Sequence, residues 1–345
     1  MIRSIPNKKL VGLMLLSIVA FSLYGNGQTE LSGAGTQKPE FVLKAGGTGN
    51  LGGAWDSLYL GFAKEVEEKS NGRIKVDFYP GNALGGEREL MEMVQQGLAD
   101  VNMSSNMAYS IFDPNWAILD IPYLFSTREE IYRFLDSPAS QKLKDGMLAK
   151  GVRVLGVGEN AVRQISNTKH EVDTVDDLKG LKIRVPETPA LMDWVKSVGA
   201  DPTVLPFPEL YPALQQGVVD GQDNGMVTGS TMKFQEVQKY WTDTNHLFSV
   251  IPVAISERTW QKLPPDLQDV VAKAAMNAGK AGRQSALDAE KDIVQKLKAA
   301  GVKVTLLTNE QRATFVKSAE PIVKKYGAKI DPELWSATME FLGRN

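Results

Sequence analysis

Short runs of alternating apolar and polar residues recur along the chain, and segments with helical periodicity lie between them. The alternation predicts strands over 40–47, 73–80 and 101–105. Helices are expected between these strands, over 54–72 and 85–100. The chain therefore begins with strand and helix segments in strict succession.

The middle and the second half of the chain continue this order, after an apolar connector over 117–125 and a helix near 128–149. The remaining predicted elements are strands over 152–159, 162–168, 181–186, 201–207 and 218–224 and helices over 189–200 and 208–217. Repeated strand, helix and strand units are typical of α/β lobes with mainly parallel sheets, which is the fold class that we expect.

The stretch 265–300 is rich in Ala, Lys, Asp and Gln and predicts one long helix. Unbroken, this helix would measure about 54 Å at 1.5 Å per residue. Because that length exceeds what a single lobe needs, we expect the helix to cross two lobes or to kink near Gly279 or Gly282.

The strand at 181–186 carries a cation, Arg184, two residues before the proline that ends the strand. Leu181 and Ile183 belong to its apolar face, whereas Lys182 and Arg184 share the opposite face. A solvated strand face is the ordinary interpretation of this pattern. The role of Arg184 therefore depends on the segments around it.

The N-terminus differs in composition from the rest of the chain. Residues 1–9 carry three basic residues and no acid, an apolar run follows, and small residues stand at Gly25 and Gly27. This order is typical of a secretory signal peptide, and an apolar run of about 15 residues is shorter than the roughly 20 that span a membrane. We expect a signal peptide over 1–27, removed on export, and a flexible leader over 28–39.

The remaining composition is that of a globular protein, since 43% of the residues are hydrophobic and 23% are charged. The absence of cysteine excludes disulfides, thiol catalysis and cysteine-ligated metals. Loss of residues 1–27 removes three of the 39 basic residues and leaves 36 against 41 acidic ones, a net charge of about −5. With no basic tract, the chain is not expected to bind nucleic acid.

The sequence GGTGNLGG over 46–53 is the strongest enzymatic motif. Gly47, Gly49 and Gly52 form G-x-G-x-x-G between a predicted strand and a predicted helix, as in a dinucleotide-binding turn. The acidic residue that should follow, Asp77, lies inside its strand rather than at the strand's end. A dinucleotide-dependent enzyme is therefore a remote alternative.

Other catalytic motifs are missing from the sequence. It contains neither G-x-x-x-x-G-K-[ST] nor G-x-S-x-G, and its two histidines, His170 and His246, stand in no metal-binding arrangement. His246 has no obvious nucleophile beside it in the sequence, so we expect it to be structural. The sequence therefore favours a protein that is not an enzyme and that binds neither a metal nor a cofactor.

Several segments together resemble the periplasmic solute-binding proteins of TRAP (tripartite ATP-independent periplasmic) transporters. They are YPGNALGGERELMEMVQQGLADV, DLKGLKIRVPETP, GADPTVLPFPELYPALQQGVVDGQDN, KFQEVQKYWTDTNH and SERTWQKLPPDLQDVV. The resemblance extends from about Phe41 to the long C-terminal helix and is most specific over 177–246.

This resemblance implies a type II-like periplasmic binding fold. Two α/β lobes are joined by crossing strands and a long C-terminal helix that spans both, with a ligand cleft between them. On this basis we expect one lobe to contain 40–160 and 250–289, and the other to contain 161–249 and 290–345.

The resemblance also places an arginine that forms a two-pronged salt bridge with the ligand carboxylate at Arg184. The chemistry agrees, because a guanidinium is planar, always charged, and matches a carboxylate with paired N–H donors. By the same resemblance Arg163 contacts the ligand, Phe207 packs on it and Asn224 hydrogen-bonds its carboxylate. Their structural alternatives are a surface arginine, a core phenylalanine and a turn asparagine. The family's usual Glu-Asn-Pro is replaced here by Asp-Asn-Gly, a change expected to alter the stiffness of the turn.

Three further cleft positions differ from the sialic-acid-binding members. Thr48, Glu87 and Ser105 stand where that branch typically has Asn, Asp and Glu, and the change at Ser105 removes an acceptor for ligand hydroxyls. We therefore expect a smaller sugar acid, a uronate or an aldonate. A C4-dicarboxylate or a 2-oxo acid is the alternative within the family.

The expected function is extracytoplasmic capture of an organic acid anion and its delivery to the small and large membrane subunits of a TRAP transporter. Contacts from both lobes favour the closed state when the ligand is bound. The protein is expected to be a periplasmic monomer. A ligand-presenting sensor subunit that docks on a receptor kinase is an alternative role for the same cleft.

Overall fold

The computed structural model describes residues 38–344, so the predicted signal peptide and most of the predicted leader lie outside it. In these residues nine strands form one mixed sheet of order β2-β1-β3-β8-β4-β7-β5-β6, and β9 pairs with β8. The strands are β1 (Phe41–Gly47), β2 (Ile74–Tyr79), β3 (Val101–Met103), β4 (Val152–Asn167), β5 (Lys182–Val185), β6 (Asp201–Val204), β7 (Gly221–Asn224), β8 (Tyr240–Ser256) and β9 (Lys303–Thr305).

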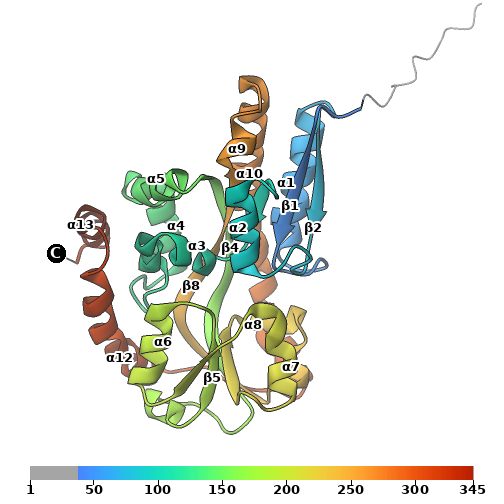
Figure 1. Cartoon of the computed structure of the whole chain (residues 1–345). Coiled ribbons are helices and arrows are strands. Elements are labelled where there is room, and N and C mark those ends of the chain that lie inside the picture. Colours follow the sequence, from blue (N-terminus) through green and yellow to red (C-terminus); the bar gives the residue numbers. More distant parts are fainter. Residues whose placement is uncertain (1–37, 345) are drawn as a thin grey trace, which may run out of the picture. The chain divides into compact units, whose positions relative to one another are not determined.

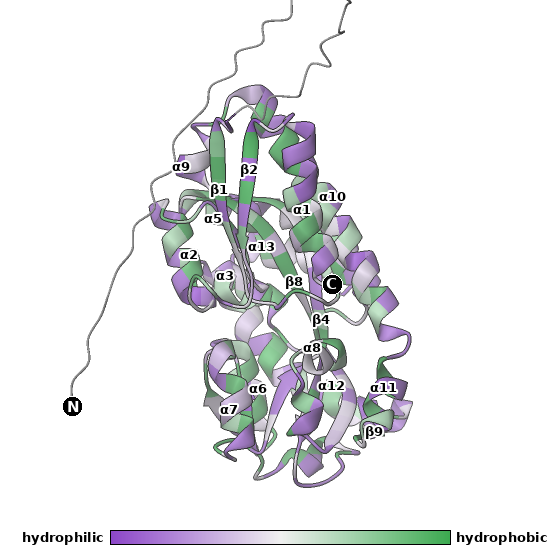
Figure 2. Cartoon of the chain, turned by 90° about the vertical axis from the view of Figure 1, so that its right-hand side faces the viewer, coloured by the Kyte–Doolittle hydropathy of each residue, from purple (hydrophilic) through white to green (hydrophobic). Residues whose placement is uncertain are grey.

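Helices alternate with these strands and pack on the sheet (Figure 1). They are α1 (Asp56–Lys69), α2 (Glu87–Gln96), α3 (Asn106–Phe112), α4 (Arg128–Asp136), α5 (Gln141–Ala149), α6 (Pro189–Ser197), α7 (Leu210–Gln215), α8 (Met226–Thr231), α9 (Glu257–Trp260), α10 (Pro265–Glu290), α11 (Ile293–Ala299), α12 (Asn309–Gly327) and α13 (Pro332–Phe341). Many of them carry both hydrophobic and hydrophilic residues, as expected for helices that pack one face on a sheet (Figure 2). None of the helices between residues 38 and 344 is long and apolar enough to cross a membrane.

Two long antiparallel strands, β4 and β8, form the centre of the sheet and connect its two halves (Figure 1). Their pairing begins with Val152 opposite Ser256 and ends with Asn167 opposite Tyr240. The outer pairs β1-β2, β1-β3, β5-β6 and β5-β7 are all parallel. The architecture is therefore the predicted two-lobed α/β fold with crossing strands, whereas the exact lobe boundaries stay predictions.

Separate apolar clusters stabilise the two ends of the sheet. Leu58 and Phe62 of α1 are fully buried in a cluster with β1, β2 and α10, and Phe234 and Trp241 are buried in a cluster with α7 and α11. Burial of each such side chain contributes about 1.5–3 kcal/mol. A third cluster contains buried residues of both halves, among them Met91 and Trp116 on one side and Ile183 and Trp194 on the other. The sheet thus has a local core at each end and a core that both halves share.

Two predictions about local structure were wrong. The strands expected over 152–159 and 162–168 are one continuous strand, β4, whose register shifts between Glu159 and Ala161. The helix expected near 128–149 is two helices separated by a 3-10 turn, which begins at Pro138. Proline has no N–H to continue the helical hydrogen bonds, so the chain turns there.

The long helix is not interrupted at its glycines. α10 runs unbroken through Gly279 and Gly282, and the chain breaks instead between Glu290 and Ile293. A Cβ at Gly279 would lie 2.7 Å from the carbonyl oxygen of Val157, so this glycine allows α10 to approach β4 closely. Of the two alternatives, a break of the helix at these glycines is wrong, and Gly279 instead permits close packing.

Candidate functional site

All seven residues singled out in the sequence line one pocket between the two halves of the sheet. They are Thr48, Glu87, Ser105, Arg163, Arg184, Phe207 and Asn224. The same pocket is also lined by five residues that the sequence did not indicate, namely Trp55, Met107, Asn160, Pro186 and Thr228. A neighbouring pocket with a cavity volume of about 180 Å³ shares Glu87, Arg184 and Phe207 and opens toward Arg88 and Glu187.

Arg184 is held on β5 with its guanidinium oriented by a backbone carbonyl. Its Nε and Nη2 donate to the carbonyl oxygen of Leu205 at 3.0 and 2.7 Å, and its Cζ lies 6.0 Å from the centre of the Phe207 ring. Burial lowers the pKa of Arg184 to about 10, so the side chain is still a cation at neutral pH. A guanidinium has five N–H donors, and residues 38–344 occupy two of them. The solvated strand face is therefore wrong for Arg184, which is 3% exposed.

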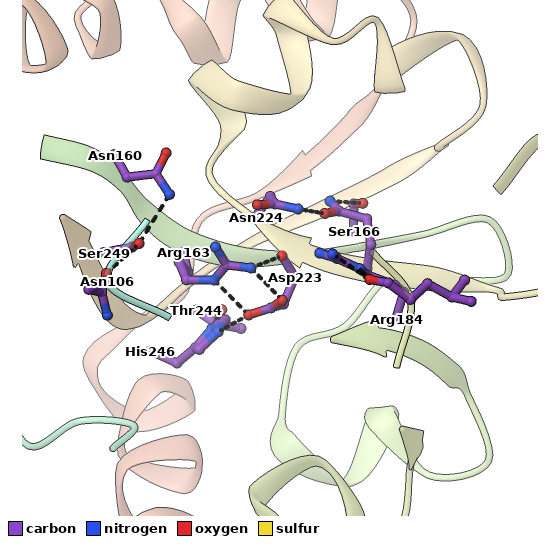
Figure 3. A network of polar contacts seen from close by, with 12 residues as sticks. Asn106, Asn160, Arg163, Ser166, Arg184, Asp223, Asn224, Thr244, His246 and Ser249 are labelled. Carbon is purple, nitrogen blue, oxygen red and sulfur yellow. Dashed lines mark hydrogen bonds and ion pairs between the residues drawn. The ribbon is translucent and has the colours of Figure 1, made fainter. Parts of the chain in front are cut away.

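Arg163 on β4 lies in a buried ion pair with Asp223 on β7 (Figure 3). Its Nε and Nη2 donate to the two carboxylate oxygens at 2.8 and 2.6 Å. Burial alone would raise the pKa of Asp223, but the charge and hydrogen bonds of Arg163 and the contact with His246 lower it. Arg163 therefore lines the pocket with its charge already balanced.

His246 completes this arrangement from β8. Its Nε2 lies 3.2 Å from Asp223, its Nδ1 lies 2.9 Å from the hydroxyl of Thr244, and its ring stacks on Trp194. Burial lowers the pKa of His246, which keeps the imidazole neutral. A neutral ring with N–H toward Asp223 and an acceptor toward Thr244 satisfies both contacts, so its surroundings are those of a structural histidine.

Glu87 begins α2 and brings a carboxylate into the pocket. It accepts a hydrogen bond from the backbone N–H of Ser105 at 3.1 Å. Burial raises the pKa of Glu87, opposed by the hydrogen bonds from Ser105 and by the charges of Arg184 and Arg163. The next residue, Arg88, forms an exposed ion pair with Glu187, which lies after β5 in the other half of the sheet.

The glycine-rich segment over 46–53 forms part of the pocket wall through Thr48. A Cβ at Gly49 would lie 2.0 Å from the ring of Trp55, and one at Gly47 would lie 2.9 Å from the ring of Tyr59. These glycines are needed for close packing against aromatic rings, which gives the motif a structural explanation. In the part of the chain that the structure describes, no cluster of histidine and acidic side chains is arranged to hold a metal ion.

The pocket residues that sequence reasoning missed have no distinctive local signal. Trp55 precedes α1 and donates from Nε1 to the carbonyl oxygen of Asn160 at 3.2 Å. Asn160 itself lies at one of the three register shifts of β4, between two segments that were expected to be separate strands. Thr228 on α8 has a buried hydroxyl without a partner among residues 38–344.

Comparisons with known proteins agree with this architecture. A family model described as bacterial extracellular solute-binding protein, family 7, matches residues 56–329. The sialic acid-binding periplasmic protein SiaP of Vibrio cholerae is 32% identical over 301 residues, which cover 87% of this chain and 92% of that relative.

Two solved structures are similar over nearly the whole described chain. A TRAP periplasmic solute-binding protein from Polaromonas sp. JS666, bound to D-erythronate, is 34% identical with a TM-score of 0.83 and coverage of 86% of this chain and 98% of that one. Another from Sulfurospirillum deleyianum DSM 6946, with bound succinate, is 31% identical with a TM-score of 0.82 and coverage of 87% and 99%. Because these are binding proteins, the remote alternative of a dinucleotide-dependent enzyme is wrong. The chain belongs to the bacterial extracellular solute-binding proteins of family 7.

Proposed function

We propose that the protein captures a small sugar acid, an aldonate or a uronate, and delivers it to the membrane subunits of a TRAP transporter. The charge distribution in the pocket carries this proposal. Arg184 has N–H donors that no residue in 38–344 occupies, whereas the charge of Arg163 is balanced by Asp223. One available cation suits one carboxylate.

The rest of the pocket wall suits hydroxyl groups. Glu87 is an acceptor, Ser105 and Thr48 are polar, and the hydroxyl of Thr228 has no partner between residues 38 and 344. Because a second ligand carboxylate would add a negative charge near Glu87, a C4-dicarboxylate fits less well. The succinate in the Sulfurospirillum relative is the observation that keeps a C4-dicarboxylate as the second candidate, and a 2-oxo acid is a weaker one.

Each predicted residue then has a distinct task. Arg184 binds the ligand carboxylate through N–H donors on a rigid strand, and Phe207 covers the ligand beside it. Arg163 and Asn224 orient the carboxylate end, while Glu87 and its neighbours bind the hydroxyl groups. The buried ion pair with Asp223 holds the Arg163 side chain in place for this contact.

The lobes separate to admit the ligand. The pocket that all seven predicted residues line has a cavity volume of about 20 Å³, which is room for about one water molecule. Contacts across its mouth, including the ion pair of Arg88 with Glu187, stabilise the closed state. Small-angle scattering is expected to show a more compact protein with the ligand than without it, and equal profiles would contradict closure.

The partners proposed from the family are a small and a large membrane subunit, with the mature protein a periplasmic monomer after removal of 1–27. The same cleft would serve a sensor subunit that docks on a receptor kinase. Co-purification with the membrane subunits would favour transport, and ligand-dependent binding to the kinase alone would favour sensing.

Thermal melting of the mature protein with a panel of acids tests the proposed ligand class. The panel contains D-erythronate, D-galactonate, D-glucuronate, sialic acid, succinate and a 2-oxo acid, with NAD as a control. A ligand at 100 times its Kd adds about 2.7 kcal/mol to the free energy of unfolding, which raises the melting temperature measurably. A shift with sugar acids that disappears in Arg184→Ala supports the proposal. A shift with succinate alone would replace it with the dicarboxylate candidate.

A further inference from the structure

A buried chain of hydrogen bonds runs from the pocket into the interior through Asn160 (Figure 3). Nδ2 of Asn160 donates to the hydroxyl of Ser249 at 3.1 Å, and that hydroxyl donates to Oδ1 of Asn106 at 2.9 Å. Nδ2 of Asn106 then donates to Oδ1 of Asp120 at 2.7 Å. The three inner members, Ser249, Asn106 and Asp120, are at most 1% exposed.

The direction of every bond in this chain is fixed from its inner end. Oδ1 of Asn106 also accepts the backbone N–H of Val250 at 2.8 Å, so that oxygen must be an acceptor and Nδ2 must face Asp120. The only hydroxyl hydrogen of Ser249 is therefore used on Asn106. Ser249 can only accept from the side of Asn160, which fixes Nδ2 of Asn160 toward Ser249 and turns its Oδ1 away (Figure 3).

A second series of hydrogen bonds, which starts at Asn224, is likewise fixed in direction from its inner end. Nδ2 of Asn224 donates to Gln222, Gln222 donates to Ser166, and Ser166 donates to Gln238 at 2.7, 2.8 and 2.9 Å. Gln238 ends the chain by donating to the carbonyl oxygen of Val237, which can only accept. Two asparagine amides in one pocket are thus each held in one orientation by buried partners.

We propose that Asn160 determines ligand specificity, because its Oδ1 is held available to accept a hydrogen bond from a ligand hydroxyl. This inference rests on the proposed binding of a sugar acid. Asn160 lines the pocket, and no group between residues 38 and 344 donates to its Oδ1. Ser249, Asn106 and Asp120 act as positioning residues, since none of them lines the pocket and they act on Asn160 through this series of hydrogen bonds.

Calorimetric titration of D-erythronate and its 2-, 3- and 4-deoxy analogues tests this role. Wild-type protein is expected to bind one analogue about tenfold more weakly than erythronate, because a net hydrogen bond contributes about 1.4 kcal/mol. Asn160→Leu and Ser249→Ala are expected to weaken the binding of erythronate by a similar factor. Both variants should change the affinity for that one analogue by no more than twofold. Asn160 is half-buried at the pocket wall, so Asn160→Leu alone can test this role if Ser249→Ala does not fold.

Thr242→Val is the matched control. Thr242 is also on β8, is buried, and donates its hydroxyl to the carbonyl oxygen of Val172 at 2.9 Å, outside both chains. It should change none of the four affinities by more than twofold. The role of Asn160 would be overturned if Asn160→Leu weakened the binding of erythronate and all three analogues equally, or did not weaken binding at all. Either result would leave the proposed function standing. Failure of wild-type protein to bind any sugar acid in the melting panel would overturn the proposed function as well.

Discussion

Arg184→Met removes the guanidinium and keeps a side chain of comparable length. Burial lowers the pKa of Arg184 to about 10, well below the usual range of an arginine, which means that the folded protein disfavours the charged form. At about 1.4 kcal/mol per pKa unit, the buried cation opposes folding by about 3 kcal/mol. Loss of the hydrogen bonds to the carbonyl oxygen of Leu205 destabilises the variant by about 1–3 kcal/mol, which offsets the gain from removing the charge. The ligand-free variant should therefore melt at or above the temperature of ligand-free wild type.

Binding should respond in the opposite direction. Truncating one partner of a buried charge pair typically costs about 2–5 kcal/mol, which corresponds to a loss of affinity of about 30-fold to several thousand-fold. Calorimetric titration with D-erythronate measures this loss, and thermal melting without ligand measures the stability. The combination of unchanged stability and lost affinity is expected for a residue whose charge is reserved for a ligand.

Arg153→Met is the control for removal of an arginine. Arg153 is also on a strand, β4, and pairs with Glu257 at 2.7 and 2.8 Å while stacking over Trp260. This variant should keep its affinity for erythronate and lose some stability. If Arg184→Met melted well below wild type and still bound erythronate with unchanged affinity, Arg184 would be a structural residue and the proposed site would be wrong.

Three other predictions test the fold and the cleft. Gly279→Ala places a Cβ 2.7 Å from the carbonyl oxygen of Val157 and should destabilise the protein by about 1–3 kcal/mol in urea unfolding; an unchanged midpoint would contradict the close packing of α10 on β4. Burial raises the pKa of Asp120 from 3.8 to about 7, so the stabilisation linked to its proton is complete below pH 4 and is lost as the pH rises through 7. Asp120→Asn should therefore lessen the decline in stability from pH 5 to 8, and an identical decline would refute this. Arg88→Ala breaks the exposed pair with Glu187 and should weaken erythronate binding by no more than about fivefold, less at high salt; a larger, salt-independent loss would mean that Arg88 contacts the ligand.

Periodicity predicted most strands and helices because their apolar faces pack against the sheet locally. It missed β8, although this strand has 17 residues. β8 contains polar residues such as His246 and Ser249 that are fully buried, so apolar and polar positions do not alternate along it. Their partners, Asp223 and Asn106, are distant in sequence, and only the folded chain brings them together.

The pocket could be predicted only in part, for a related reason. The resemblance to solute-binding proteins indicated Arg184 and six other lining residues, and all seven lie in one pocket. It did not indicate that Asp223 balances the charge of Arg163, because a short acidic residue next to Asn224 has no distinctive sequence signal. It also missed Asn160, whose position follows from the register shift of β4 rather than from any local motif.

The departure from the family's Glu-Asn-Pro sequence has a packing consequence at Gly225, while the expected change of turn stiffness stays a prediction. A Cβ at Gly225 would lie 2.6 Å from the Cβ of Ala161 and 2.8 Å from the carbonyl oxygen of Val162, so β7 can approach β4 this closely only with glycine there. Asp223 itself pairs with Arg163 through both carboxylate oxygens. Because this pair balances the charge of Arg163, Arg184 is the cation that we propose binds a single ligand carboxylate.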